Sequence, residues 1–149
     1  MAGLGNPLSG DDGFGARVLE QLRRSSPELP SGVSLADAHT DLLNHIEDFA
    51  GYDRIVLIDA ILDPEGKLGL PGQIASFDEA AFLAWPESSP SVHQVSPLMA
   101  VKLFRLLHPE SRSKFTLVGL VVDEIRRAPV YATNDRIAEG ADAVLTLIL

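Results

Sequence analysis

One apolar run constrains the fold of this chain more than any other feature. Residues 55–58 are Ile-Val-Leu-Ile, and the run ends in Asp59. A strand without polar residues is typical of a parallel sheet, because helices cover both faces of such a sheet. Segments of helical period lie on either side of this run, which is the pattern of repeated βα units. The sequence therefore predicts an α/β domain built on a mostly parallel sheet.

The remaining elements follow from periodicity and from end signals. Phe14, Val18 and Leu22 are spaced for one helical face, which predicts a helix to about Arg24. Strands are expected at 2–5, 33–37, 54–59, 72–77 and 115–122, and helices from Thr40 or Asp41 to Gly51, from Ser96-Pro97 and from Asn134-Asp135. The strand at 72–77 is expected at an edge, and residues 78–92 are expected to be irregular. The helix from Ser96 is expected to bury Leu98, Met99, Leu103, Leu106 and Leu107, with Lys102 and Arg105 pointing outward.

Composition bounds the class of protein. The chain has 149 residues, and we expect residues 1–149 to form a single domain with its own core. A formal net charge of −9 argues against binding to a nucleic-acid backbone. The absence of cysteine excludes disulfides, zinc–thiolate sites and thiol nucleophiles. No apolar run approaches the roughly 20 residues of a membrane helix, and no signal peptide is evident. We therefore expect a cytoplasmic protein with no membrane partner, monomeric by default.

Three of the predicted strands end in an acid, at Asp37, Asp59 and Asp123. The carboxyl ends of strands form the ligand-binding crevice of open α/β sheets. Asp59 is the strongest candidate, because an ionised carboxylate after a buried strand is costly unless it is paired, hydrogen-bonded or bound to a cation. The alternative interpretation is an aspartate that caps the following loop.

The segment Gly3–Gly15, Gly-Leu-Gly-Asn-Pro-Leu-Ser-Gly-Asp-Asp-Gly-Phe-Gly, joins the first strand to the first helix. A phosphate-binding loop is also rich in glycine, but two carboxylates at the helix start would repel a phosphate. No Gly-Lys-Ser/Thr ending follows, either. The simplest interpretation is a tight turn in which Asp11 or Asp12 caps the helix. Both roles are compatible if Asp11 caps while Asp12 faces the crevice.

Histidine supplies the remaining candidate ligand. His93 precedes the helix that begins at Ser96, where a histidine is more often a structural residue than a ligand. His45 and His108 fall within and at the end of helices, and His39 lies in a loop after a strand. Together, Asp12, Asp59 and His93 form a set of two carboxylates and one imidazole. Such a set suits a divalent first-row metal with open coordination positions, without choosing among zinc, nickel, manganese and iron.

Three separated stretches resemble the hydrogenase maturation proteases, the endopeptidases that trim the C-terminal extension from the large subunit of nickel–iron hydrogenases. Residues 3–15 are close to the family's N-terminal signature, and residues 55–60 and 91–96 match two further stretches. The first stretch is specific, and the His-Gln pair of the third is characteristic. Their order and spacing agree along nearly the whole chain. The resemblance implies a three-layer αβα fold, phosphorylase/hydrolase-like, with about five strands.

The resemblance also implies roles for particular residues. Asp12, Asp59 and His93 fall on the family's three metal-binding positions, the same trio that the residues indicate by themselves. The resemblance implies that this site recognises nickel already inserted in the substrate, so that only a loaded precursor is cut. The implied partner is therefore a nickel–iron hydrogenase large-subunit precursor, which supplies the nickel.

Two departures from the family pattern limit this inference. Only Met1-Ala2 precedes the glycine signature, where relatives carry a full strand, so the first strand is expected to be truncated. Asp37-Ala38-His39-Thr40 stands where many relatives carry Asp-Gly-Gly-Thr, in a loop associated with substrate selection and cleavage. Replacing two glycines removes backbone freedom and adds an imidazole, which favours a different choice of partner.

The leading hypothesis is metal-dependent cleavage of one peptide bond in a hydrogenase precursor. Asp12, Asp59 and His93 would carry the reaction, with Asp37 or His39 as candidate assisting groups. The metal would position the precursor, polarise the scissile carbonyl or activate water, and the sequence does not separate these roles. No Gly-x-Ser-x-Gly elbow and no His-Glu-x-x-His helix supports a standard serine or zinc peptidase.

Three rival hypotheses remain. Peptidyl-tRNA hydrolases also open with Gly-Leu-Gly-Asn-Pro, but their following Thr-Arg-His-Asn segment is absent here and the charge is wrong for tRNA. A non-catalytic assembly factor would bind the metal-loaded large subunit without cutting it. A plain α/β domain without a site would require three accidental motif matches.

Overall fold

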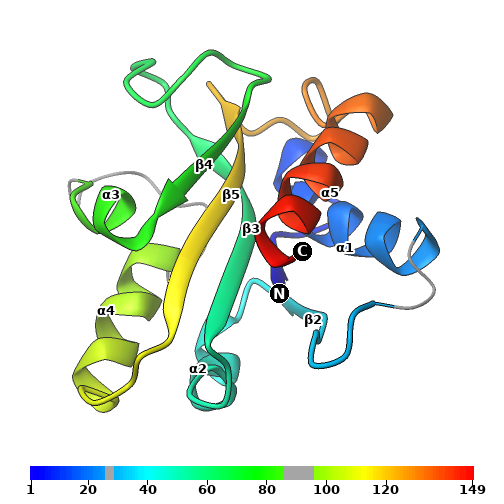
Figure 1. Cartoon of the computed structure of the whole chain (residues 1–149). Helices are drawn as coiled ribbons and strands as arrows, with labels where there is room; N and C mark the ends of the chain where they lie inside the picture. Colours follow the sequence, from blue (N-terminus) through cyan, green and yellow to red (C-terminus); the bar gives the residue numbers. More distant parts are fainter. Residues whose placement is uncertain (26–28, 86–95) are drawn as a thin grey trace.

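Five strands form one twisted sheet in the order β2-β1-β3-β5-β4, with β4 antiparallel to its neighbour (Figure 1). A computed structural model of the chain describes residues 1–25, 29–85 and 96–149. The strands are β1 (Ala2–Leu4), β2 (Ala36–His39), β3 (Arg54–Leu62), β4 (Ile74–Asp78) and β5 (Lys114–Val122). The predicted mostly parallel sheet is confirmed, and so is the edge position of the fourth strand.

Helices cover both faces of the sheet and complete three layers (Figure 1). They are the 3₁₀ turn η1 (Gly10–Gly13), α1 (Phe14–Ser25), the 3₁₀ turn η2 (Leu42–His45), α2 (Ile46–Phe49), α3 (Glu79–Leu83), α4 (Pro97–Leu107) and α5 (Asn134–Ile148). Helices α1 and α5 lie on one face, and α2, α3 and α4 lie on the other (Figure 1). Within the described ranges, no helix is both long enough and apolar enough to cross a bilayer.

The apolar run of β3 separates the two halves of the core. Alternate side chains of a strand point to opposite faces. Val56 and Ile58 pack with the residues of α1 and α5. Ile55 and Leu57 pack with the residues of α2, α3 and α4. Burial on both faces explains why this strand needs aliphatic side chains at every one of these positions.

Strand β1 is short but lies in the middle of the sheet. Ala2 and Leu4 are buried, and β1 pairs with β2 on one side and β3 on the other. Ala2 aligns with Leu57, three residues after the start of β3. The first residues of β3 therefore extend past the amino end of β1, which leaves a recess between β2 and β3.

Several expected boundaries and faces are corrected by the structure. Strand β2 is Ala36–His39 rather than 33–37, and α3 occupies part of the stretch expected to be irregular. Helix α3 begins there because Asp78 caps it, accepting the N–H of Ala81 at 2.8 Å. Helix α4 begins after Ser96 as expected, but it buries Leu98, Ala100, Val101 and Phe104 and leaves Met99, Leu103, Leu106 and Leu107 exposed.

Candidate functional site

The glycine-rich segment forms a tight turn that fixes Asp12 at the carboxyl end of β1. Gly5 has a φ of +96°, and a Cβ there would lie 1.7 Å from the carbonyl O of Asp12, so only glycine fits. The N–H of Asn6 donates to Oδ2 of Asp12 at 2.8 Å, and the side-chain carbonyl of Asn6 accepts the N–H of Leu8 at 2.9 Å. Asp12 itself is buried. The sequence reasoning did not single out Asn6, although its place directly after Gly5 in the turn was the available signal.

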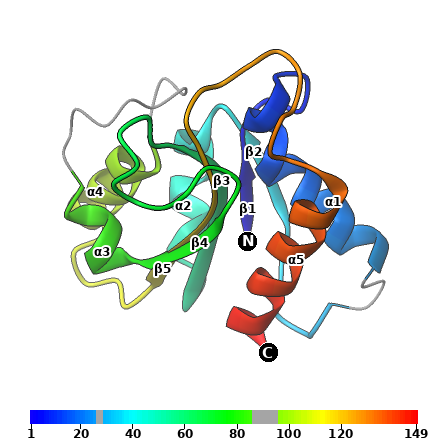
Figure 2. The ribbon, with the colours of Figure 1, turned by 90° about the horizontal axis from the view of Figure 1, so that it is seen from above.

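Asp11 does not cap the first helix, contrary to one expectation. Its Oδ1 accepts three backbone N–H groups, those of Val130, Tyr131 and Ala132, at 3.0, 2.8 and 2.7 Å. Figure 2 shows the connection between β5 and α5 passing over the segment that precedes α1. Asp11 therefore fastens that connection to η1 and has a structural role. Asp12, one residue later, remains the candidate site residue of this segment.

Asp59 lies inside β3 rather than at its end, because the strand continues to Leu62 and Asp59 aligns with Gly119 of β5. The neighbouring strand β1 is much shorter. Gly3 aligns with Ile58, so the last residue of β1 stands beside Asp59. Asp59 is buried, and its Oδ1 accepts the N–H of Ala60 at 2.8 Å. The structure therefore brings Asp12 and Asp59 to the same end of β1, where η1 contacts β3.

The third predicted ligand, His93, lies outside the described residues, so the trio as a metal site remains a prediction. Helix α4 begins at Pro97, four residues after His93 in the sequence, and lies on the same face as Leu57. Strand alternation places Asp59 on that face as well. Among the described residues, no three His, Asp or Glu side chains gather as a metal site would require.

The donor chemistry of the two acids suits a divalent cation. A carboxylate offers about four acceptor positions on its two oxygens. The hydrogen bonds from Asn6 and Ala60 each engage one oxygen of Asp12 and Asp59, respectively. In metal sites, hydrogen bonds of this kind from neighbouring groups orient the carboxylates that bind the metal. The two acids therefore fit the oxygen half of the predicted ligand set.

The other two acids expected at strand ends are held in ion pairs. Asp37 lies 2.9 Å from Arg23 in the last turn of α1, which places its side chain on the face opposite to that of Asp59. Asp123 is half exposed and lies 3.2 Å from Arg126. Desolvation raises the pKa of Asp123, but the hydrogen bond and charge of Arg126 outweigh it, so the pKa lies below its ordinary value. These geometries favour Asp12 and Asp59 over Asp37 and Asp123 as site residues.

His39 ends β2 beside the glycine-rich turn. Its carbonyl O accepts the N–H of Gly5 at 2.7 Å. The remaining described histidines stand beside carboxylates, His45 at 3.7 Å from Asp48 and His108 at 3.3 Å from Glu47. His108 stands at the end of α4, the position expected from the sequence.

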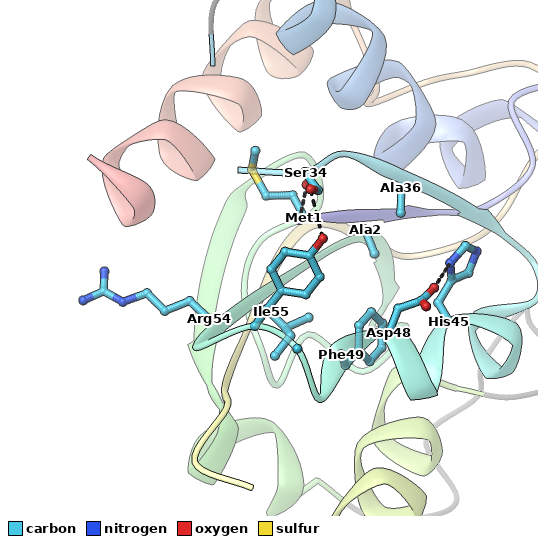
Figure 3. Close-up of a pocket in the computed structure, with 11 residues that line it drawn as sticks. Met1, Ala2, Ser34, Ala36, His45, Asp48, Phe49, Arg54 and Ile55 are labelled. Atoms are coloured by element: carbon cyan, nitrogen blue, oxygen red, sulfur yellow. Dashed lines mark hydrogen bonds and ion pairs between the residues drawn. The ribbon is translucent and has the colours of Figure 1, made fainter. Parts of the chain in front are cut away.

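A cavity of about 460 Å³ opens at the other end of the sheet (Figure 3). Met1, Ser34, Phe49, Arg54 and Ile55 are among its lining residues. Apart from Phe49, which ends α2, these residues lie at the amino ends of β1, β2 and β3, whereas Asp12 and Asp59 lie at the carboxyl end of β1. The cavity is the recess left where β3 begins before β1, and it is separate from the candidate site.

A mostly parallel sheet between two layers of helices, with buried acids where the first strand meets the first helix, places the chain among the three-layer α/β proteins. Comparison with known proteins identifies the family within that class. The hydrogenase expression/formation protein HoxM of Cupriavidus necator is 30% identical to this chain over 149 aligned positions, covering 94% of the chain and 70% of the relative. The Hydrogenase 2 maturation protease of Escherichia coli is 28% identical and covers 84% of the chain and 73% of the relative. The chain belongs to the hydrogenase maturation protease family, and it is a peptidase of that family.

Solved structures show the same fold. The hydrogenase-maturating endopeptidase HybD of Escherichia coli matches 99% of this chain and 89% of its own with a TM-score of 0.77 and 24% identity. The [NiFe] hydrogenase maturation protease HybD of Thermococcus kodakarensis matches 98% of this chain and 95% of its own, with a TM-score of 0.72 and 23% identity. No protein-family model matches the chain.

Proposed function

We propose that this protein is the endopeptidase that removes the C-terminal extension of a nickel–iron hydrogenase large-subunit precursor after nickel insertion. One observation carries the proposal: Asp12 and Asp59, two buried acids, lie at the same end of β1 in a chain of this family. The reaction adds one water across one peptide bond, which yields the trimmed subunit and the released C-terminal peptide.

Asp12, Asp59 and His93 would bind the nickel that the precursor already carries. The nickel is part of the substrate, so a precursor without nickel lacks the metal ion that these side chains would bind. Binding through the metal would place the C-terminal segment at the carboxyl edge of β1 and keep it there. Holding a reacting bond beside its catalytic groups removes much of the entropic barrier to reaction. This arrangement makes nickel a checkpoint for cleavage.

The hydrogen bonds around the two acids support this role. Asn6 holds Asp12, and the N–H of Ala60 holds Asp59, so each carboxylate keeps its orientation while the substrate is absent. A site that is already arranged gives up less free energy when the substrate binds. Of the two candidate assisting groups, His39 at the neighbouring end of β2 remains, whereas Asp37 is paired with Arg23 on the opposite face of the sheet.

The test is the mass of the precursor after incubation with the purified protein, with and without nickel. A nickel-dependent loss of one C-terminal peptide, repeated many times per protein molecule, is the expected result. Stoichiometric binding without cleavage would instead identify an assembly factor. A precursor that is neither bound nor cut would refute the proposal.

Three variants test the site itself. Asp12→Asn, Asp59→Asn and His93→Ala should each abolish cleavage while the protein stays folded by circular dichroism. Asp123→Asn is the matched control. Asp123 follows the carboxyl end of β5, but it pairs with Arg126, so its removal should leave cleavage intact. Normal cleavage by any one of the first three would remove that residue from the site.

A further inference from the structure

The end of β2 holds a side chain in a backbone conformation that favours glycine. His39 has a φ of +46°, and no other non-glycine residue in the described parts of the chain has a positive φ. The left-handed region is unfavourable for L-residues, because Cβ approaches the following carbonyl oxygen. Histidine is found there more often than most side chains, but glycine adopts it without cost.

The strand pairing fixes this conformation through backbone atoms. The register between β1 and β2 skips Ala38, so that His39 aligns with Leu4. The carbonyl O of His39 then accepts the N–H of Gly5 at 2.7 Å. A glycine at position 39 would make the same hydrogen bond with less strain. The local fold therefore does not explain why a side chain stands at this position.

Contacts within the protein do not explain the imidazole, either. The side chain of His39 is exposed and makes no hydrogen bond, ion pair or ring contact with the residues that the structure describes. His45 and His108 differ in this respect, since each lies beside a carboxylate. The imidazole of His39 is therefore available to a bound molecule.

The position of His39 connects it to the candidate site. Gly5, its hydrogen-bond partner, packs directly on the backbone of Asp12, and Asn6 holds the Asp12 carboxylate. Backbone strain that the surrounding structure maintains is concentrated at functional sites. We propose that the His39 imidazole contacts the precursor polypeptide, by a hydrogen bond to a peptide group next to the scissile bond. It thereby contributes to the affinity for the substrate. This inference rests on the proposed endopeptidase function.

His39→Gly is the decisive variant, because it removes the imidazole and leaves the backbone hydrogen bond to Gly5 in place. With the nickel-loaded precursor as substrate, KM is expected to rise about tenfold and kcat to stay within about twofold, as for the loss of one substrate hydrogen bond. His39→Asn should lie between wild type and His39→Gly, since asparagine tolerates the same backbone and its amide can donate. His45→Asn is the matched control and should leave KM unchanged.

Thermal unfolding separates this role from a structural one. His39→Gly should leave the Tm unchanged or raise it by up to about 3 °C, because relief of strain offsets the greater freedom of glycine in the unfolded chain. A KM within about twofold of wild type, or a Tm lowered by about 5 °C or more, would overturn the inference. If the wild type binds but does not cut, the endopeptidase function fails, and the Kd of the intact precursor then tests His39 instead of KM. If the wild type neither binds nor cuts, both are overturned.

Discussion

Replacing Asp11 by alanine is expected to detach the connection between β5 and α5 from the start of the first helix. The carboxylate is fully buried, and a single oxygen accepts the N–H groups of Val130, Tyr131 and Ala132. Alanine offers no acceptor for any of them. Gly10 also packs against the carbonyl O of Arg126 in this connection, so the two segments meet closely.

The loss of stability expected for Asp11→Ala depends on how deeply each of the three N–H groups is buried. The N–H of Ala132 is buried, and leaving it without an acceptor costs about 1–3 kcal/mol. The N–H groups of Val130 and Tyr131 are partly buried and can bind water, so each contributes about 1 kcal/mol. The total loss expected for Asp11→Ala is therefore about 4 kcal/mol, a large part of the roughly 5–15 kcal/mol of a typical domain.

Asp11→Asn separates the loss of the negative charge from the loss of the acceptor oxygen. The amide keeps one acceptor oxygen for the three N–H groups but loses the negative charge. It also places an NH₂ group where Oδ2 is buried with no hydrogen-bond partner among the described residues. The expected loss is about 2 kcal/mol, between alanine and wild type. Asp135→Ala is the control, because Asp135 is an exposed acid in the first turn of α5 and its loss should change stability by less than about 0.5 kcal/mol.

Urea unfolding measures this loss of stability. The single tryptophan, Trp85, packs on Phe77 of β4, far along the sheet from η1, so its fluorescence reports unfolding of the whole domain. Trypsin cleavage after Arg126 or Arg127 reports opening of the connection itself. An unfolding midpoint equal to that of wild type, with no faster cleavage at these arginines, would refute the structural role of Asp11.

Three further predictions concern the turn, an ion pair and the exposed side of α4. Gly5→Ala should abolish cleavage and lower stability by more than about 2 kcal/mol, because its Cβ would collide with the carbonyl of Asp12. Gly32→Ala, with positive φ but open space around it, should cost only about 1 kcal/mol in the same urea assay. Arg105→Gln should lower stability by about 3 kcal/mol, because its two hydrogen bonds of 2.6 Å to the carboxylate of Glu79 are lost. An unchanged unfolding midpoint would contradict this. Leu106→Gln should change stability by less than about 0.5 kcal/mol, and a larger loss would show that this exposed side chain is buried in solution.

The strands and helix starts could be predicted from the sequence because their signals are local. The aliphatic run predicted β3, and the serine before a proline predicted the start of α4, where Ser96 accepts the N–H of Met99 at 3.2 Å. The buried face of α4 could not be predicted in the same way. The helix carries apolar side chains all around its surface. The face that is buried is the one with Phe104, which packs against the rings of Phe49 and Phe115 from distant segments.

The roles of two charged residues also depend on contacts outside their own segments, and the sequence did not predict them. Arg105 was expected to point outward, but it pairs with Glu79 and donates to the carbonyls of Ser111 and Ser113. Asp11 was expected to cap a helix, but it binds backbone from the far end of the chain. Glu79 lies 26 residues from Arg105, and Ala132 lies 121 residues from Asp11. Local sequence patterns carry no information about such contacts.

The strand boundary predicted at Asp59 was wrong, but the structure explains why an acid stands at this position. The acid was taken as the end of its strand, and the structure continues that strand to Leu62. An acid can be kept inside β3 because the adjacent strand β1 stops beside it, so the sheet has a step at this point. The turn through Gly5 brings Asp12 to the same step. The acid after this apolar run therefore marks the end of the neighbouring strand β1, and the two buried carboxylates of the proposed site meet at that step in the sheet.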